Sequence, residues 1–104
     1  MTDHAALLAA LEKTARDLPD GIEVTDADGL TTWTRGGGRF AVLRGSVVDL
    51  RVGAAIAAAA LRTPDVTTPA RGSDWVAFAP LELDAHALDR LGAWFAAAHR
   101  RAVA

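Results

Sequence analysis

Residues 22 to 52 alternate short β-prone segments with turns rich in glycine and aspartate, and this pattern constrains the fold more than any other feature. The four segments span residues 22–25, 30–35, 40–43 and 47–52. Turn residues separate them at 26–29, at the glycine triplet 36–38 and at 44–46. Short segments that alternate apolar with polar residues between such turns are typical of antiparallel hairpins. We therefore expect two hairpins, the second with Val48, Leu50 and Val52 on one buried face.

Helical spacing is found at both ends of the chain. In the first segment one face carries Leu7, Leu11, Ala15 and Leu18, Asp3 is the expected N-cap, and Pro19, Asp20 and Gly21 end the helix. In the last segment Asp84 is the expected N-cap, the apolar stripe consists of Leu88, Leu91, Phe95 and Ala98, and Arg100 and Arg101 lie near the end. Apolar residues three and four positions apart predict amphipathic helices that bury one side.

Between the hairpins and the last helix the sequence contains an alanine-rich run, a polar stretch and a short apolar segment. An almost continuous alanine run around Ile56, residues 54–61, favours a short helix that packs closely on the sheet. Residues 63–72 are mostly polar and predict a loop, and residues 75–78 are typical of a buried strand. The expected order is α-β-β-β-β-α-β-α, an α+β two-layer sandwich with a mainly antiparallel sheet and helices on one face.

Composition sets the size of the core and removes several classes of protein. The 104 residues suit a single domain, residues 1–104, and 24 of them are alanine, so the core depends on a modest number of larger apolar side chains. The chain has no cysteine, which excludes disulfides, thiolate catalysis and cysteine-ligated metal centres. No apolar run approaches the ~20 residues that cross a bilayer, so we expect a cytoplasmic protein with no membrane partner.

Charge is distributed unevenly, although the formal net charge is only −2. Residues 1–34 hold seven acidic residues against two basic ones, whereas residues 35–71 hold six arginines against two acidic residues. The six are Arg35, Arg39, Arg44, Arg51, Arg62 and Arg71. Arginines gathered in this way either form a solvated surface or face an anionic ligand or an acidic partner.

Familiar catalytic motifs are missing from the sequence. The glycine triplet 36–38 lies between two strands and lacks the pattern of a phosphate-binding loop, so a hairpin turn explains it. The three histidines show no metal-ligand spacing, and neither Ser46 nor Ser73 has the context of a nucleophile elbow. We therefore assign no catalytic residue, no metal ligand and no cofactor.

The stretch Arg71-Gly72-Ser73-Asp74-Trp75 is the most informative candidate site, because a polar loop runs there directly into a buried strand. One interpretation is structural: Arg71 pairs with Asp74, and Trp75 anchors the core. The other is a pocket in which Arg51 and Arg71 accept an anion beside Asp74, with Trp75 or Trp33 as an apolar wall. Both interpretations stay open from the sequence alone.

Three short runs in the second half of the chain resemble a known family. They are Asp49-Leu50-Arg51-Val52-Gly53, Ala59-Ala60-Leu61-Arg62-Thr63-Pro64-Asp65 and Arg71-Gly72-Ser73-Asp74-Trp75-Val76-Ala77-Phe78-Ala79-Pro80. Residues 30 to 101 are similar to small actinobacterial domains labelled "luciferase family", whose biochemical role is not established. The resemblance implies no bioluminescence, because flavin-dependent luciferases resemble barrels of ~250 residues and this chain is too short to build one.

The order of elements is also similar to that of the MmcQ/YjbR-like family. In that family a strand-rich centre is followed by a helix, a strand with a Trp-Val pair and a terminal helix, and Trp75-Val76 matches this pattern. The resemblance implies a fold like that of CyaY and a DNA-binding role. The lysines typical of the middle strands in that family are absent here, and neither resemblance transfers a catalytic residue.

These observations predict a non-enzymatic binding or accessory domain that holds an anionic small molecule or an acidic protein partner. The separation of charge along the chain and the lack of a catalytic motif support this prediction. A nucleic-acid-binding protein is one alternative, and a small enzyme that uses Asp74 or His86 as an acid–base is another. The oligomeric state stays open.

Overall fold

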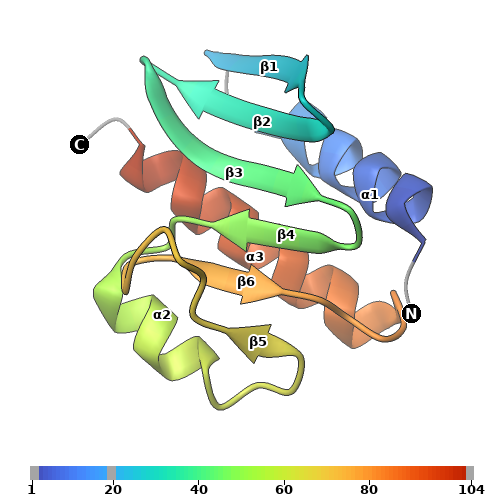
Figure 1. Cartoon of the computed structure of the whole chain (residues 1–104), viewed down its shortest axis with the longest axis vertical. Helices are drawn as coiled ribbons and strands as arrows, with labels where there is room; N and C mark the ends of the chain where they lie inside the picture. Colours follow the sequence, from blue (N-terminus) through green and yellow to red (C-terminus); the bar gives the residue numbers. More distant parts are fainter. Residues whose placement is uncertain (1–2, 19–20, 103–104) are drawn as a thin grey trace.

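Three helices and a six-stranded sheet make up the described part of the chain, residues 3–18 and 21–102 of a computed structural model (Figure 1). The elements are α1 (His4–Arg16), β1 (Ile22–Ala27), β2 (Leu30–Arg35), β3 (Gly38–Arg44), β4 (Val47–Leu50), α2 (Ala54–Ala60), β5 (Val66–Thr67), β6 (Val76–Phe78) and α3 (Ala85–Arg101). The strand order is β1-β2-β3-β4-β6-β5, and all neighbouring strands are antiparallel.

The expected α+β class, with an antiparallel sheet and helices packed on it, is confirmed. The order differs by one element, because residues 63–72 were expected to form a loop and contain the strand β5. This strand has only two residues, and it pairs with β6 through Val66 opposite Phe78 and Thr67 opposite Ala77. Two residues are too few for an alternating pattern, so the sequence carries no periodic signal for β5.

Two-residue turns join the first four strands into a continuous meander. Asp28 and Gly29 both have positive φ, of 55° and 76°, as do Gly36 and Gly37 in the next turn. Such backbone conformations match the right-handed twist of the flanking strands in tight hairpins, and aspartate and glycine tolerate them. Local turn chemistry therefore sets the register of the meander.

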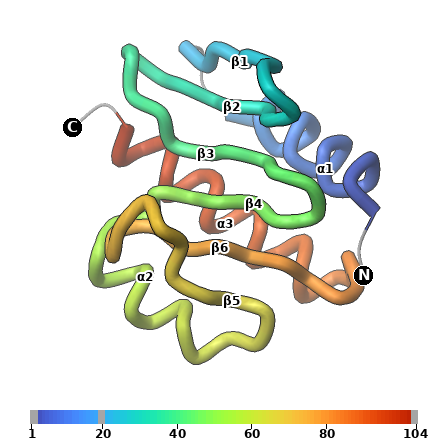
Figure 2. Tube along the Cα trace, viewed as in Figure 1, coloured from blue at the N-terminus to red at the C-terminus, as the bar shows by residue number. Residues whose placement is uncertain are grey.

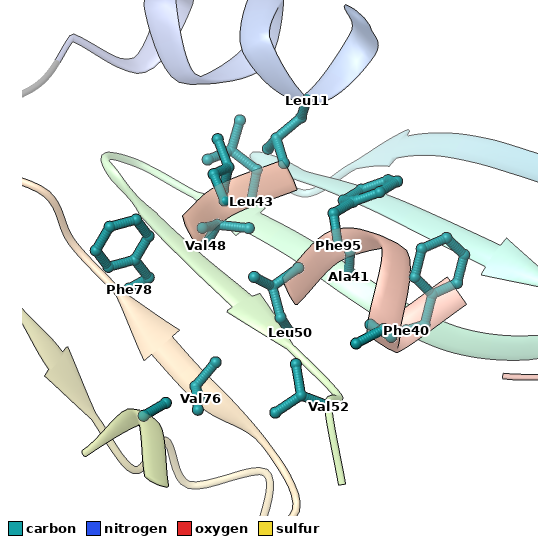
Figure 3. Packing of buried hydrophobic residues seen from close by; sticks show 14 of the residues in the cluster. Leu11, Phe40, Ala41, Leu43, Val48, Leu50, Val52, Val76, Phe78 and Phe95 are labelled. Carbon is teal, nitrogen blue, oxygen red and sulfur yellow. The ribbon is translucent and has the colours of Figure 1, made fainter. Parts of the chain in front are cut away.

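One face of the sheet is apolar and packs against the helices. The register places two rows of side chains on this face: Trp33, Ala41, Leu50 and Val76 in one row, and Leu43, Val48, Phe78 and Val66 in the other. All eight belong to one cluster of buried residues that includes side chains from all three helices. Figure 3 shows side chains from β3, β4 and β6 converging on Phe95 of α3 and Leu11 of α1.

The first helix buries the face expected from its spacing. Leu7 and Leu11 are fully buried, Ala15 and Leu18 pack partly against the core, and the Asp3 side chain accepts a hydrogen bond from the Ala5 amide at the N-terminus. The expected stop at Pro19 and Asp20 lies outside the described residues.

The last helix confirms most of its predicted stripe and corrects one member. Asp84 caps it by accepting a hydrogen bond from the Ala87 amide, and Leu91, Phe95 and Ala98 are fully buried. The prediction for Leu88 was wrong, because its side chain is 46% exposed. Ala87 takes the buried place instead, since it lies one full helical turn before Leu91.

Aromatic side chains of α3 pack against aromatic side chains of the sheet. The Phe95 ring meets Trp33 and Phe40 edge-to-face, with ring centroids 5.9 Å and 5.3 Å apart. Trp94 meets Phe78 in the same way at 5.2 Å, so its role is packing against the core. Edge-to-face contacts of this kind stabilise a core beyond the area they bury.

The alanine-rich helix α2 lies beside the β6 and β5 end of the sheet (Figure 2). Ala57 and Ala60 are buried in the common core, while Ile56 is exposed. The expected short helix is therefore present, and two of its alanines contribute to the core. No helix in residues 3–18 and 21–102 combines the length and apolar character needed to span a bilayer.

His99 is the one histidine buried within the described chain. Its Nδ1 lies 3.3 Å from a terminal nitrogen of Arg35, which also donates to the His99 carbonyl at 2.9 Å. Arginine only donates, so Nδ1 accepts and the neutral ring carries its proton on Nε2. Burial lowers the pKa of His99, and the charges of Arg35 and Arg100 lower it further.

Replacing Leu91 by alanine is expected to destabilise the fold by about 3 kcal/mol, because the change leaves a cavity in the core. Leu88→Ala on the same helix is the matched control and should cost under about 1 kcal/mol, since Leu88 is largely exposed. Urea unfolding of both variants measures the difference, and equal losses would contradict the assignment of the buried stripe.

Stability is expected to fall as the pH drops through about 6.5, the ordinary histidine value. The unfolded chain takes up the proton at His99 before the folded chain does, so acid favours unfolding. Free energies of unfolding between about pH 7.5 and about pH 5.5 should show this slope. His99→Gln should flatten this slope, and an unchanged slope in that variant contradicts the account.

Candidate functional site

The sheet face opposite the helices carries a row of side chains that crosses every strand of the described sheet. In order across the sheet the row is Thr25, Thr32, Val42, Asp49, Ala77 and Thr67. Each alternates along its strand with a residue on the helix side, so the row points away from the core. We call this side the open face.

The centre of the open face is covered although none of α1, α2 and α3 packs there. Val42 and Asp49 are each only 1% exposed. The connection between β5 and β6 crosses in front of β6 in Figure 1, on the side of the sheet away from α1 and α3. It brings Pro69, Ala70 and Arg71 next to Asp49. This segment, residues 68–75, is called the covering loop.

Two arginines hold the buried carboxylate of Asp49. Arg44 donates from Nε to Oδ2 at 2.9 Å and from Nη2 to Oδ1 at 3.0 Å. Arg71 donates from its Nε to Oδ2 at 2.9 Å. A carboxylate at this depth needs such charge-assisted bonds to offset its lost hydration. The hydrogen bond with Asp49 raises the pKa of Arg44. These three residues form the Asp49 cluster.

Arg71 is also positioned by Trp75. Its guanidinium carbon lies 5.4 Å from the centre of the indole ring, within the range of a cation–π contact. Trp75 is nearly buried, and it lies outside the main core cluster. Only Nε of Arg71 donates a hydrogen bond within the described chain, so the terminal nitrogens stay available there for another acceptor.

Arg51 and Asp74 form a separate ion pair. Arg51 Nε donates to Asp74 Oδ2 at 2.9 Å, and both side chains are partly exposed. This hydrogen bond is the main cause of the lowered pKa of Asp74. The expected pairing of Arg71 with Asp74 is therefore corrected: Arg71 pairs with Asp49, and Asp74 pairs with Arg51.

Trp33 lies on the wrong side of the sheet to share a pocket with Trp75. It is fully buried against Phe95 in the core, and its indole nitrogen has no hydrogen-bond partner among the described residues. The structure thus brings Arg71 together with Trp75, and Arg51 together with Asp74. It separates Trp33 from both pairs.

A hollow of about 320 Å³ opens beside the Asp49 cluster, over β1, β2 and β3. Its lining consists of Thr25, Ala27, Asp28, Leu30, Thr32, Thr34, Arg39 and Arg71. Arg39 is exposed and has no ion pair within residues 3–18 and 21–102. Two arginines and three threonines therefore line one cavity.

The threonines of this hollow were not predicted as site residues. The signal lies in the segment 30–35, where Thr32 and Thr34 alternate with Trp33. Since Trp33 points into the core, both threonines must point to the open face. The same alternation excludes Trp33 from that face.

The residues suggested for acid–base chemistry lie apart from each other. His86 lines a different hollow, near the start of α3, and Asp74 is engaged by Arg51. Among the described residues, no group of three or more histidine, aspartate or glutamate side chains is placed to hold a metal ion.

Asp49→Asn is expected to destabilise the protein by about 2 kcal/mol, because it leaves two guanidinium groups against a neutral, buried amide. Asp74→Asn is the matched control in the exposed pair and should cost under about 1 kcal/mol. Chemical unfolding at neutral pH checks both values. A smaller loss for Asp49→Asn than for Asp74→Asn would contradict the central role of the Asp49 cluster.

Comparison with known protein families, with curated proteins and with solved structures finds no match to this chain.

Proposed function

We propose that this chain is a binding domain that holds an anionic small molecule in the hollow on the open face. The observation that carries the proposal is the state of Arg71. Asp49 and Trp75 hold its guanidinium group, its terminal nitrogens have no hydrogen-bond acceptor within the described residues, and Arg71 lines a cavity together with Arg39 and three threonines. A donor that is already ordered loses little entropy when it binds a ligand.

Electrostatics around the hollow favour an anion. Arg39 and Arg71 line it and Arg44 adjoins it, whereas the nearby carboxylates are those of Asp49 and of Asp28 in the lining, so positive charge is in excess by one. Guanidinium groups bind carboxylate and phosphate through paired, charge-assisted hydrogen bonds. Threonine hydroxyls add donors for the remaining oxygens.

A binding role suits these side chains better than catalysis. Hydroxyl and guanidinium groups donate hydrogen bonds, and a guanidinium does not accept a proton at neutral pH. Among the described residues, Asp28 is the one carboxylate in the lining, and it stands at the turn between β1 and β2. We therefore keep a non-enzymatic domain of the cytoplasm as the proposal.

An acidic protein partner presents the same carboxylate chemistry to the hollow as a free anion does. The MmcQ/YjbR-like resemblance instead suggests nucleic acid, and the net charge of −2 opposes that. The resemblance to "luciferase family" domains supports no particular ligand. The experiment below separates these alternatives.

The test is a calorimetric and NMR titration at low salt with inorganic phosphate, with succinate and with a random DNA duplex. Phosphate or succinate should shift the amide signals of Thr32, Thr34 and Arg39. Arg39→Gln should weaken binding about tenfold, because it removes one charged donor without touching the Asp49 cluster. Arg62→Gln, an exposed arginine outside the hollow, should leave affinity unchanged.

Salt gives a second criterion. Exposed charge contacts are screened over about 10 Å at 0.1 M ionic strength, so affinity should fall as salt is added. The proposal would be overturned if neither phosphate nor succinate binds at low salt. It would also be overturned if the parent protein and Arg39→Gln bind these anions with equal affinity. Tight binding of the duplex with a steep salt slope would replace it with the nucleic-acid function.

A further inference from the structure

A second hollow, of about 410 Å³, lies at the opposite end of the sheet from β1. It forms where the connection from α2 to β5 meets the connection from β6 to α3. The side chains that matter for its chemistry are Asp65, Phe78, Pro80, Glu82, His86 and Arg90. None of its lining residues contributes to the hollow on the open face.

Hydrogen bonds hold the backbone around this second hollow in place. Ala79 donates its amide hydrogen to the Asp65 carbonyl at 2.9 Å, directly after the pairing of Val66 with Phe78. Asp65 has a φ of 70°, a left-handed conformation that aspartate and asparagine tolerate better than most residues. On the other side Asp84 caps α3. The walls are therefore held by paired backbone on both sides.

Apolar residues lie under and beside the second hollow. Phe78 and Pro80 are buried beneath it, and the ring of Phe78 packs edge-to-face on Trp94. Leu81 stands at the rim with 67% of its surface exposed. A volume near 400 Å³ with apolar residues under and beside it matches the size and lining of small-molecule sites.

Both signs of charge surround this second hollow. Asp65 and Glu82 have no ion pair within the described chain, and neither has Arg90. The carboxylate of Asp84 differs, since the Ala87 amide binds it. Two free carboxylates and one free guanidinium group thus stand around an apolar surface.

We infer that this second hollow binds a small α-amino acid with an apolar side chain. The ammonium group pairs with Asp65 and Glu82, the carboxylate pairs with the fork of Arg90, and the side chain packs against the exposed Leu81. A ligand with only an ammonium group leaves Arg90 unpaired and brings a second positive charge close to it. A ligand with only a carboxylate is repelled by the carboxylates of Asp65 and Glu82. Only a ligand with both groups satisfies all three charged side chains.

The test uses L-leucine and two analogues that each lack one charged group. They are 3-methylbutylamine, which has no carboxylate, and 4-methylpentanoate, which has no ammonium group. Calorimetry gives the affinities, and NMR shifts of the Phe78 and Ala87 amides and the Trp94 indole locate the ligand. L-Leucine should bind at least about tenfold more tightly than either analogue, since each analogue loses a charge-assisted contact.

Variants assign each charged group to its role. Arg90→Gln should reduce leucine affinity to that of the amine, and Asp65→Asn combined with Glu82→Gln should reduce it to that of 4-methylpentanoate. Asparagine keeps the left-handed conformation at position 65, so the fold should persist. Arg100→Gln and Glu12→Gln are matched controls on exposed positions outside this hollow and should bind leucine as the parent does.

Several outcomes would overturn the inference. These are an amine that binds as tightly as leucine, no binding of any of the three compounds, or leucine shifts confined to residues outside the second hollow. The two sites are tested separately, because their variants do not overlap and because NMR shifts at Phe78, Ala87 and Trp94 distinguish binding here from binding of a carboxylate beside Thr32, Thr34 and Arg39.

Discussion

The alternation of side chains along β4 is the constraint on which the rest of the structure depends. Val48 and Leu50 face the helices, so Asp49 between them must face the other way, at the centre of the open face. A carboxylate there is tolerated only if cations reach it, and Arg44 and Arg71 do so. The need to satisfy Asp49 draws the covering loop across the sheet, which in turn places Trp75 beneath Arg71 and shapes the neighbouring hollow.

Features set by neighbouring residues were predictable from the sequence. The hairpins follow from glycine and aspartate at positions that demand positive φ, and the caps at Asp3 and Asp84 follow from side chains that reach their own helix. Strand β5 was not predictable, since two residues carry no period and only their pairing with β6 defines them. The prediction for Leu88 was wrong for a related reason. The spacing of apolar residues identifies one side of the helix, but contact with the sheet determines which of these residues are buried.

In the candidate site, too, contacts between residues close in sequence were predictable, whereas contacts between distant residues were not. Arg71 and Trp75 stood out because a polar loop meets a buried strand there, and they do lie together. The choice of ionic partner depended on the fold, because Asp49 is twenty-two positions from Arg71 in sequence and adjacent to it only across the open face. Trp33 could have been excluded by applying the strand period to Thr32 and Thr34. The hollow is lined by residues from three strands, such as Thr25 and Arg39. Their proximity can be predicted only when the register of the meander is known.

Strand β1 is the long free edge of this sheet, and all of its residues except Ile22 are exposed. An edge of six residues offers unpaired amide and carbonyl groups to any other strand, which is the usual route to edge-to-edge aggregation. Glu23 and Asp26 place negative charges along it, and a second copy would bring its own carboxylates against them. Like charges that must lose water on pairing repel, so the acidic residues of β1 oppose the addition of a second copy at this edge of the sheet.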